Sequence, residues 1–442
     1  MKIIFFVFFL WTSIYGETIG VMGAGYVGLT LTEILVRCGH QVVCLEQDKK
    51  KIALLKQRIV PIVEPGLDSL FSGSASFSDE LASLKGVSVL FICVGTPANE
   101  TGESDYSDLY LALTQISKME IPPQLVCIKS TLAPGTIRKL EAHLGPHSSI
   151  LLAYNPEFTR EGSALSDFLS KNPIVLGVRS QEHAELLRHI YHPLFSNRPD
   201  LEWIQTTPET AELIKYGWNS FSAIRIAYVN ELSRLCNHFS GDIEILMHGI
   251  SWSETLLATK DLKPGLGFGG PCLLKDSQGL AHTFEESGIS CSLIHQAVVS
   301  NQQHIKTMTD QLHHFIGDGT KKIAIIGAAF KANTDDIRNS PAIALIDSLI
   351  KRGHLVRVSD PYALVKIKEL FPMVSCFSSP YDAAEQANCI VMLNENLEFV
   401  SLDLGELASR VSERKIADFK NIFSQEKMRE HGFQWINLGR CQ

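Results

Sequence analysis

The sequence has no basic tract and no excess of positive charge. Its 40 Lys and Arg residues are outnumbered by 48 Asp and Glu, which gives a net charge of −8. Nucleic-acid-binding proteins normally carry a basic patch or stripe, so we expect no nucleic-acid partner. The sequence also lacks an apolar run of the roughly 20 residues that a membrane-spanning helix needs, so we expect no membrane span.

Cysteine pairs at metal-binding or redox spacing are also missing. The ten cysteines are scattered, none forms a CxxC pair, and most lie in apolar runs such as SVLFICVG (88–95). Cysteine in such a run behaves as a small hydrophobic residue. We therefore expect reduced thiols, no disulfide framework and no metal site.

Two regions of alternating strand and helix patterns flank a helical region in the 442-residue chain. Short apolar runs alternate with helical stretches from residue 18 to about 205 and again from about 316, which is typical of parallel sheets covered on both faces. The predicted fold is α/β, with two Rossmann-like parallel-sheet domains joined by a long central helix (209–238) and a helical middle domain. The predicted boundaries are 1–16 for a leader or N-terminal extension, 17–205 for the first domain, 206–315 for the helical domain and 316–442 for the last domain.

A dinucleotide-binding pattern opens the first domain. Gly23, Gly25 and Gly28 form GxGxxG directly after a predicted strand and at the start of a helix. The first glycine permits the turn, the second admits a pyrophosphate close to the backbone, and the third lets the helix pack on the strand. Glu46 ends the next strand, and a carboxylate there accepts both ribose hydroxyls and repels a 2′-phosphate, which predicts NAD as the cofactor. The alternative is a glycine turn without a ligand.

One cysteine differs from the others in its surroundings. Cys272 follows glycines and a proline in GFGGPCLLKD (267–276), and a helix beginning at CLLKD would place Asp276 on the same face, with Lys275 beside them. Helix N-termini and nearby cations lower thiol pKa values, so we expect a reactive thiol; a buried structural cysteine is the alternative. A nicotinamide domain combined with a nucleophilic thiol predicts oxidation of an alcohol to an acid by two hydride transfers, through a thiohemiacetal and a thioester.

The motifs are those of a known family. From Gly20 to about Gly439 the chain resembles the UDP-glucose/GDP-mannose dehydrogenases, which oxidise the C6 alcohol of a nucleotide sugar to a carboxylate with two NAD⁺. GGPCLLKD is more similar to the UDP-glucose branch than to the GGHC form of the N-acetylmannosamine branch. The resemblance rests on GAGYVGL (23–29), PIVEPGL (61–67), VGTP (94–97), KSTLAPGT (129–136), NPEFTREGSAL (155–165), AELIKYGWNSFSAIRIAYVNE (211–231), GFGGPCLLKD (267–276) and AFKANTDDIRNSPA (329–342).

The resemblance implies a catalytic set, which consists of Cys272, Lys215, Asn219, Asp276, Glu157 and Thr131. Cys272 would be the nucleophile. Lys215 and Asn219, four residues apart on the long helix, would hold the reacting sugar and its oxyanion. Asp276 would act with Lys215 and an ordered water. Glu157 would take a proton from the water that hydrolyses the thioester, and Thr131 would position a water beside the nicotinamide.

The resemblance also implies two binding sets. The cofactor set comprises Gly23, Gly25, Tyr26, Val27, Gly28, Glu46, Lys51, Thr96, Thr131, Glu161, Lys275 and Arg338. The substrate set comprises Glu157, Phe158, Thr159, Arg160, Glu161, Lys215, Asn219, Asp261, Leu262, Lys263, Pro264, Gly265, Gly269 and Lys331. The last domain would bind the UDP-sugar and the helical domain would carry a dimer contact, so we expect a homodimer or a larger homo-oligomer. For Lys51, an ordinary exposed lysine is the alternative.

Two departures from the family pattern leave the sugar open. Leu256 stands where an arginine usually reaches the sugar in a neighbouring subunit, and Lys420 replaces the arginine of a late DGRN motif. Leucine cannot make the bidentate contact of arginine. The expected reaction converts UDP-glucose to UDP-glucuronate. The alternatives are the same chemistry on a UDP-N-acetylhexosamine or GDP-mannose, and a nucleotide-sugar-binding relative with little turnover.

The first sixteen residues, MKIIFFVFFLWTSIYG, have one lysine, an apolar stretch and then small and polar residues. This is a weak signal-peptide pattern that is too short to span a bilayer. Because NAD and nucleotide sugars are cytosolic metabolites, we favour an N-terminal extension of a cytoplasmic enzyme. A cleaved leader is the alternative.

Overall fold

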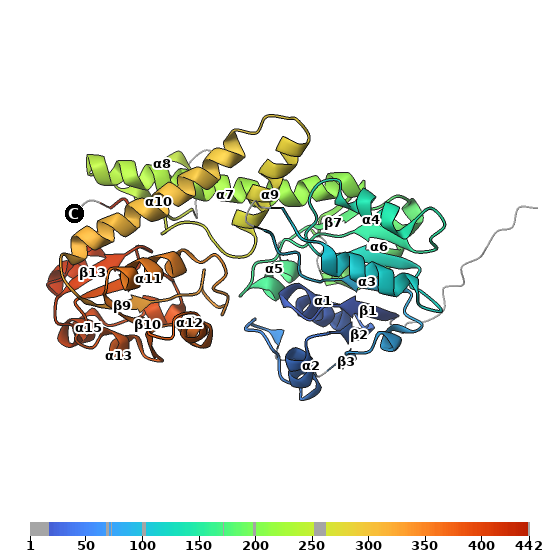
Figure 1. The fold of residues 1–442 in the computed structure, drawn as a ribbon, viewed down its shortest axis with the longest axis horizontal. Helices are drawn as coiled ribbons and strands as arrows, with labels where there is room; N and C mark the ends of the chain where they lie inside the picture. The colour runs from blue at the N-terminus through green and yellow to red at the C-terminus, as the bar shows by residue number, and fades with distance from the viewer. Residues whose placement is uncertain are drawn as a thin grey trace, which may run out of the picture.

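The computed structural model describes residues 17–67, 70–71, 73–99, 103–170, 172–197, 200–251 and 262–440. The expected leader (1–16), Leu256 and Asp261 therefore lie outside the described residues. The described chain forms two α/β domains at opposite ends of an elongated molecule, with a helical region along one side of both (Figure 1). None of the described helices is long and apolar enough to cross a membrane.

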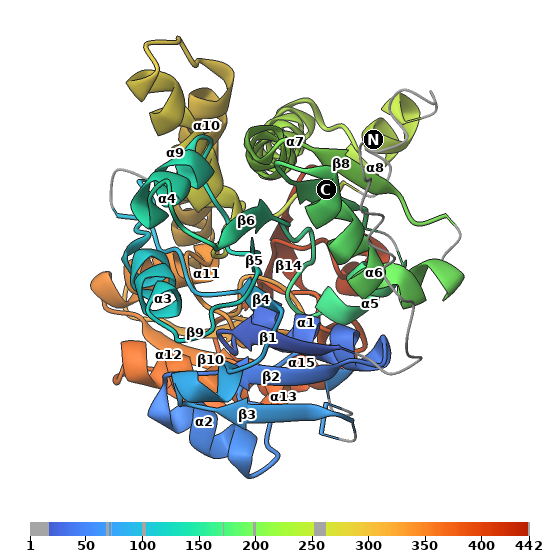
Figure 2. The same ribbon diagram turned by 90° about the vertical axis from the view of Figure 1, so that its right-hand side faces the viewer.

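The N-terminal domain contains an eight-stranded sheet in the order β3-β2-β1-β4-β5-β6-β7-β8. Its strands are β1 (Thr18–Met22), β2 (Gln41–Leu45), β3 (Ala75–Ser78), β4 (Val89–Ile92), β5 (Leu125–Ile128), β6 (Leu151–Tyr154), β7 (Ile174–Gly177) and β8 (Trp203–Thr206). The strand order reverses between β1 and β4, the position at which sheets of this type bind nucleotides (Figure 2).

One strand pair departs from the parallel arrangement that the sequence predicted. β6 and β7 share a single antiparallel pair, Tyr154 with Gly177, whereas the other neighbours are parallel. The connection between β6 and β7 stays at the carboxyl edge of the sheet, so β7 starts there and runs back. As a result, residues 155–170 remain at the edge that also carries the glycine loop instead of crossing to the other edge.

Helices cover both faces of this sheet (Figure 2). They are α1 (Tyr26–Arg37), α2 (Lys49–Lys56), α3 (Ser107–Ser117), α4 (Thr136–Leu144), α5 (Ala164–Ser170) and α6 (Gln181–Asn197), with a 3-10 turn η2 (Leu81–Leu84). Alternate residues of β4 enter different cores, because Phe91 lies in one with Leu29 of α1 and Leu90 lies in the other with Leu113 of α3. A strand buried on both faces reads as a continuous apolar run, which is the pattern that identified it.

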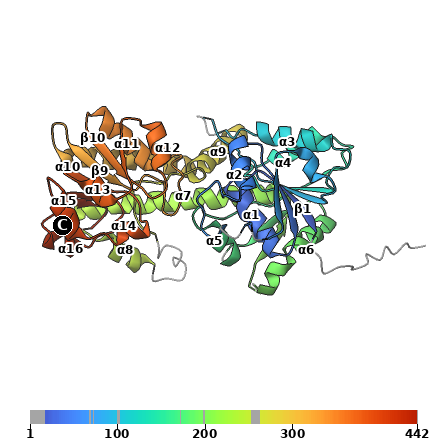
Figure 3. The ribbon, with the colours of Figure 1, turned by 90° about the horizontal axis from the view of Figure 1, so that it is seen from below.

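A 32-residue helix, α7 (Pro208–Phe239), connects the two domains. The Thr207 side chain caps its first turn, and the predicted long helix over 209–238 is confirmed. At 1.5 Å per residue α7 is about 48 Å long. It packs on β7 at one end, and at the other end Asn237 accepts a hydrogen bond from the backbone N–H of Gly439 in the C-terminal domain (Figure 3).

Three further helices complete the central region, namely α8 (Ile243–Ile250), α9 (Leu273–Glu286) and α10 (Leu293–Ile316). Cys272 is the N-cap residue of α9, which confirms the prediction that CLLKD begins a helix. Both α9 and α10 pack on α7. The cysteine therefore faces the helix that carries Lys215 and Asn219.

The C-terminal domain contains a six-stranded parallel sheet in the order β11-β10-β9-β12-β13-β14. Its strands are β9 (Lys322–Ile326), β10 (Leu355–Ser359), β11 (Ser375–Phe377), β12 (Cys389–Met392), β13 (Lys415–Asp418) and β14 (Gln434–Asn437). Its helices are α11 (Pro341–Lys351), α12 (Leu364–Leu370), α13 (Pro380–Ala384), α14 (Leu397–Val400), α15 (Leu404–Arg410) and α16 (Gln425–Glu430). The strand order again reverses between β9 and β12, as it does in nucleotide-binding sheets. This second sheet confirms the predicted fold class.

Candidate active site

The glycine loop lies between β1 and α1, at the carboxyl edge of the sheet. Gly23 has a φ of 100°, and a side chain there would meet the backbone oxygen of Cys93 at 2.7 Å. A side chain at Gly28 would lie 1.8 Å from the backbone oxygen of Gly23, so helix and strand touch through this residue. Among the described residues, nothing lies within 4 Å of the side-chain position at Gly25. That space can admit a pyrophosphate beside the N-terminus of α1.

Glu46 follows β2 and turns back toward the glycine loop. Its carboxylate accepts hydrogen bonds from the backbone N–H groups of Ala24 at 3.0 Å and Asp48 at 2.9 Å, and the ammonium of Lys51 lies 3.9 Å away. The carboxylate is thus held where the ribose of a dinucleotide on the loop would lie. The open backbone at the start of α1 and the Glu46 carboxylate, an acceptor for ribose hydroxyls, together fit NAD.

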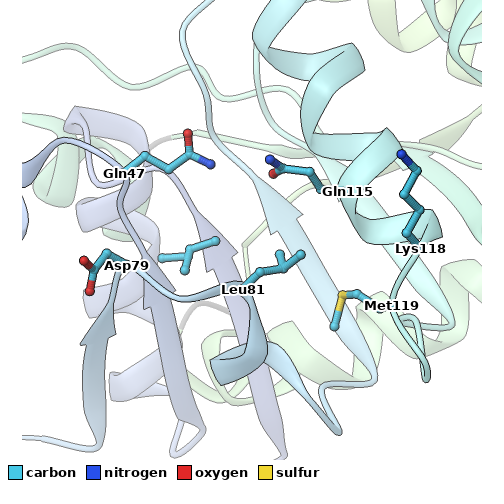
Figure 4. A pocket seen from close by; sticks show the side chains of 7 residues that line it. Gln47, Asp79, Leu81, Gln115, Lys118 and Met119 are labelled. Atoms are coloured by element: carbon cyan, nitrogen blue, oxygen red, sulfur yellow. The ribbon is translucent and has the colours of Figure 1, made fainter.

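A pocket of about 380 Å³ opens beside the strand that carries Glu46. Figure 4 shows the amides of Gln47 and Gln115 extending toward each other across it. Its lining mixes apolar and polar side chains from the ends of β2 and β3 and from α3: Leu45, Gln47, Asp79, Leu81, Gln115, Lys118 and Met119.

Three predicted site residues follow neighbouring strands. Thr96 follows β4, Thr131 follows β5 and Glu157 follows β6, and these strands are adjacent in the sheet. Because the strands are parallel, the three residues lie along one edge, next to the glycine loop. Tyr26 and Val27 form the first turn of α1; Val27 packs on the core, and the Tyr26 hydroxyl donates to Asp335 of the C-terminal domain at 2.5 Å.

Cys272 is partly buried, and the segment before it is tightly packed. Gly270, two residues earlier, has a φ of 79°, and a side chain there would lie 2.7 Å from the Phe330 ring. Burial raises the pKa of the Cys272 thiol to about 12, the nearby Asp276 adds to this rise, and Lys215 opposes it. The expected lowering of the pKa is therefore wrong, because burial outweighs the charge of Lys215, and Lys275 pairs with Asp276.

Lys215 forms a buried ion pair with Glu157. Its ammonium donates to the Glu157 backbone oxygen at 2.6 Å and to Oε1 at 3.2 Å, with side-chain exposures of 3% and 9%. Burial favours the neutral form of each group, but their mutual attraction outweighs it. The pKa of Glu157 is accordingly lowered and that of Lys215 raised. The pair is ionised at neutral pH.

The other residues of the loop after β6 mainly organise that loop. Thr159 donates to Oε2 of Glu157 from its backbone N–H at 2.6 Å and from its hydroxyl at 2.7 Å. Arg160 forms a two-point contact with Asp167 at 2.9 and 2.7 Å. The Phe158 ring lies below the Lys215 ammonium, 5.3 Å from its centre. Thus Thr159 and Arg160, predicted as substrate contacts, use their side chains within the protein.

Asn219 and Asp276 join the two helices around the cysteine. The Asn219 amide donates to Oδ2 of Asp276 at 2.5 Å, and Asp276 is fully buried. The Lys275 ammonium lies 2.7 Å from Oδ1, outside hydrogen-bond alignment. The resemblance implied that Asp276 acts with Lys215; in the structure its direct partners are Asn219 and Lys275, while Lys215 contributes through its charge nearby.

One loop of the C-terminal domain, residues 327–340, reaches the N-terminal domain. Arg338 binds Asp336 at 2.8 Å and lies 3.4 Å from Glu161. Burial, together with Asp336, raises the pKa of Glu161 to about 8. Burial lowers the pKa of Lys331, and no carboxylate of the described residues lies within 4.0 Å of its ammonium. A partly buried cation without an ion pair suits an anionic ligand.

The segment before Cys272 packs between the C-terminal domain and the helices α7 and α10. A side chain at Gly269 would lie 2.1 Å from the backbone oxygen of Asn339, so only glycine fits this contact. Gly265 is held by Asn230 at 3.0 Å, and the Lys420 ammonium lies 4.0 Å from its side-chain position. Of the other predicted substrate residues here, Pro264 is buried, Leu262 is partly buried and Lys263 is exposed, whereas Asp261 is outside the described residues.

Sequence reasoning missed two buried carboxylates that shape the site. Glu64 accepts from the backbone N–H groups of Gly162 at 2.6 Å and Ala164 at 2.7 Å, and so supports the loop after β6. Glu212 accepts from Gly135 and Ile137 beyond Thr131. For Glu64 the sequence held a signal, a lone glutamate inside the apolar stretch PIVEPGL (61–67), whereas Glu212 lies in an ordinary helical pattern.

Comparison with known proteins identifies the class. Three family models match the chain: the NAD binding domain of the UDP-glucose/GDP-mannose dehydrogenase family at residues 17–195, its central domain at 209–303 and its UDP binding domain at 324–425. The chain therefore belongs to the UDP-glucose/GDP-mannose dehydrogenase family, and NAD is its cofactor.

Relatives of nearly equal length narrow this assignment. The UDP-glucose 6-dehydrogenase of Rhizobium meliloti (strain 1021) is 34% identical over 436 residues, covering 96% of this chain and 99% of the relative. The enzyme of the same name from Rickettsia bellii is 36% identical over 431 residues, covering 95% and 98%. Among solved structures, a UDP-glucose dehydrogenase from Pyrobaculum islandicum has a TM-score of 0.83 at 26% identity, covering 96% and 98%. A UDP-D-ManNAc dehydrogenase from Pyrococcus horikoshii has a TM-score of 0.81 at 26% identity, covering 96% and 99%.

Proposed function

We propose that the protein oxidises the C6 alcohol of UDP-glucose to the carboxylate of UDP-glucuronate and reduces two NAD⁺ per sugar. The observation that carries this proposal is the meeting of three elements at one sheet edge. The loop after β6 brings Glu157, α7 brings Lys215 and Asn219, and the start of α9 brings Cys272 and Asp276. The names of the full-length relatives support glucose as the sugar.

The first oxidation converts the alcohol to an aldehyde. NAD⁺ held at the glycine loop and Glu46 would accept the hydride from C6, and a second NAD⁺ that replaces the NADH would accept the hydride of the second oxidation. Lys215 and Asn219 hold the C6 oxygen from one face of α7, where a cation and an amide donor stabilise the negative charge that develops on it. The proton of the C6 hydroxyl passes to a water held by Asp276.

The sulfur of Cys272 then forms a bond to C6 of the aldehyde. Because the pKa of the free thiol is about 12, its proton leaves during the addition and passes to the carbonyl oxygen, which gives a thiohemiacetal. The second oxidation removes a hydride from C6 and the proton from this oxygen, which gives a thioester.

Hydrolysis restores the thiol. The Glu157 carboxylate takes a proton from the attacking water, and the proton then returns to the sulfur as the C–S bond breaks. The lowered pKa of Glu157 keeps it deprotonated and available as a base. Lys331 binds a phosphate of the UDP group, which places the sugar between the two domains.

The test is a panel of UDP- and GDP-sugars in which NADH is counted per sugar consumed. Two NADH per UDP-glucose is the expected result, and none would support a nucleotide-sugar-binding relative. One NADH with release of free aldehyde would contradict the roles of Cys272 and Glu157. The Cys272→Ser variant is expected to bind the nucleotide sugar without forming the acid, and normal acid formation by it would remove the thiol from the mechanism.

A second candidate keeps the chemistry and changes the sugar. Lys420 occupies the position of the usual arginine, pairs with Glu395 at 2.6 Å and lies against Gly265 of the predicted substrate segment. A lysine presents a single charge where arginine presents a planar fork. A UDP-N-acetylhexosamine that turns over faster than UDP-glucose in the same panel would support this candidate.

The protein also forms a homodimer through α7. Phe221, Tyr228, Leu235 and Phe239 are each half exposed or more, and their spacing places them along one stripe of the helix. A second copy with the same stripe would cover these residues. Light scattering should give the mass of a dimer or a multiple of it, and Phe221→Glu with Tyr228→Glu should give monomers. A monomeric wild-type protein would refute the interface.

The domain division and the location of the enzyme complete the proposal. The NAD-binding domain covers 17–205, the central domain 206–315 and the UDP-sugar-binding domain 316–442; the last strand of the first sheet ends at Thr206 and α10 ends at Ile316. The cytoplasm supplies the expected ligands, and cell fractionation should find the protein with cytoplasmic marker enzymes; its recovery with secreted proteins would contradict this location.

A further inference from the structure

Glu212 is a fully buried carboxylate outside the predicted catalytic set. It lies on α7, and its two oxygens accept hydrogen bonds from the backbone N–H groups of Gly135 and Ile137, both at 2.7 Å. These N–H groups belong to the start of α4, whose own N-cap residue is a glycine without a side chain. A carboxylate from another helix therefore performs the capping that the local sequence does not provide.

The segment capped in this way is the end of the loop that contains Thr131. Two tyrosine hydroxyls bind the same loop, because Tyr154 accepts from the N–H of Leu132 at 3.3 Å and Tyr106 accepts from the N–H of Ala133 at 2.7 Å. Glu212 adds two shorter, charge-assisted bonds. It is the only one of these three anchors that comes from the helix bearing the catalytic lysine.

Lys215 follows Glu212 by three residues, so both lie on the same side of α7. Lys215 fixes the loop after β6 through Glu157, and Glu212 fixes the loop after β5 through the start of α4. One turn of α7 thus sets the position of the loop after β5 relative to the loop after β6, at the carboxyl edge of the sheet. We propose that Glu212 is a positioning residue that holds the Thr131 loop in register with Lys215 for hydride transfer, an inference that rests on the proposed function.

The charge of Glu212 is set by its surroundings. Burial raises its pKa to about 7, although the bonds from Ile137 and Gly135 lower it. The other charged or titratable groups around it are Glu209 on α7, Arg179 after β7, Tyr154 at the end of β6 and Tyr106 before α3, and Arg138 on α4 pairs with Glu209. Protonation removes a good acceptor from one of the two N–H groups, so the loop is held most firmly above pH 7.

The test compares Glu212→Gln with wild type in single-turnover NADH formation from UDP-glucose. The glutamine keeps the shape but must place its NH₂ group against one backbone N–H. We expect hydride transfer to slow by about ten- to a hundredfold, as for a small misplacement of reacting groups, with an unchanged Kd for UDP-glucose. Wild type should lose rate as the pH falls through 7, and the glutamine variant should lack that loss. Glu212→Asp, which keeps the charge, should recover part of the rate.

Glu209→Gln is the matched control, because Glu209 is on the same helix and its carboxylate pairs with the side chains of Arg138 and Arg179. Above pH 8, where Glu212 is ionised with or without the charge of Glu209, this variant should transfer hydride at the wild-type rate. If Glu212→Gln and Glu212→Asp both melt earlier than wild type but transfer hydride at the wild-type rate per folded molecule, Glu212 is only a cap and the proposal is overturned. If wild type itself forms no NADH from any nucleotide sugar, the proposed function fails and this inference fails with it.

Discussion

Replacing Lys215 by methionine removes one partner of a buried ion pair and leaves its shape nearly unchanged. The Glu157 carboxylate would remain in a site where its side chain is 9% exposed, without the ammonium 3.2 Å away. Breaking a buried pair in this way costs about 3 to 5 kcal/mol. We therefore expect the free energy of unfolding at pH 8, measured with urea, to fall by about that amount.

The pH dependence of this loss of stability identifies the residue that causes it. Without Lys215, burial dominates and the folded-state pKa of Glu157 rises above its unfolded value of about 4.3. Such a group destabilises the fold as the pH rises from the unfolded pKa toward the raised folded pKa. The deficit of Lys215→Met should accordingly be smaller at pH 5 than at pH 8. Adding Glu157→Gln should restore most of the lost stability, since both charges are then gone.

The same variant should also lower turnover by about a hundred- to a thousandfold, because a donor to the developing oxyanion is lost. If the loss of stability is equal at pH 5 and pH 8, or if adding Glu157→Gln does not relieve it, then the unpaired buried charge is not that of Glu157. The ion-pair account would then be wrong, whatever happened to the activity.

Three further predictions concern the cysteine and the two ligand sites. Iodoacetamide should modify Cys272 of the free protein slowly at pH 8 and faster up to pH 11, because burial raises the thiol pKa to about 12; peptide mass spectrometry that showed rapid labelling at pH 7 would contradict this. Tyr26→Phe removes the hydrogen bond to Asp335 across the domains. Calorimetry should show that this variant binds NAD several-fold more weakly than wild type when UDP is present, and equally well when UDP is absent. Equal weakening under both conditions would show that the contact does not couple the domains. Lys331→Met should raise the Kd for UDP at least tenfold and leave that for NAD unchanged, and an unchanged Kd for UDP would exclude the phosphate role.

The order of strands and helices along the chain could be predicted from the sequence because each of these elements depends on a local sequence pattern. The glycine turn, Glu46 and the first turn of α9 with Cys272 and Asp276 are set by residues at most a few turns apart, and all are found where the spacing predicted them. The long helix α7 begins and ends within one residue of the predicted 209–238. Such features need no knowledge of tertiary packing.

What the sequence could not provide depends on distant contacts. Lys275 stands three residues after Cys272, which suggested an activating cation, but the fold directs its ammonium to Asp276. The crowding around the segment before the cysteine comes partly from Phe330 in the other domain. Glu212 is an ordinary helical glutamate by sequence, and only the fold brings α4 to it. The antiparallel pair of β6 and β7 likewise follows from the path of a loop.

In the proposed mechanism the sulfur of Cys272 holds the sugar covalently from the aldehyde onward, through the second oxidation and until hydrolysis. The most direct measurement mixes the Glu157→Gln variant with UDP-glucose and NAD, quenches with acid, and examines the peptide that contains Cys272 by mass spectrometry. We expect a burst of two NADH per active site and a UDP-glucuronyl thioester on Cys272 that hydrolyses slowly. A burst of two NADH with Cys272 unmodified and free UDP-glucuronate in solution would contradict it.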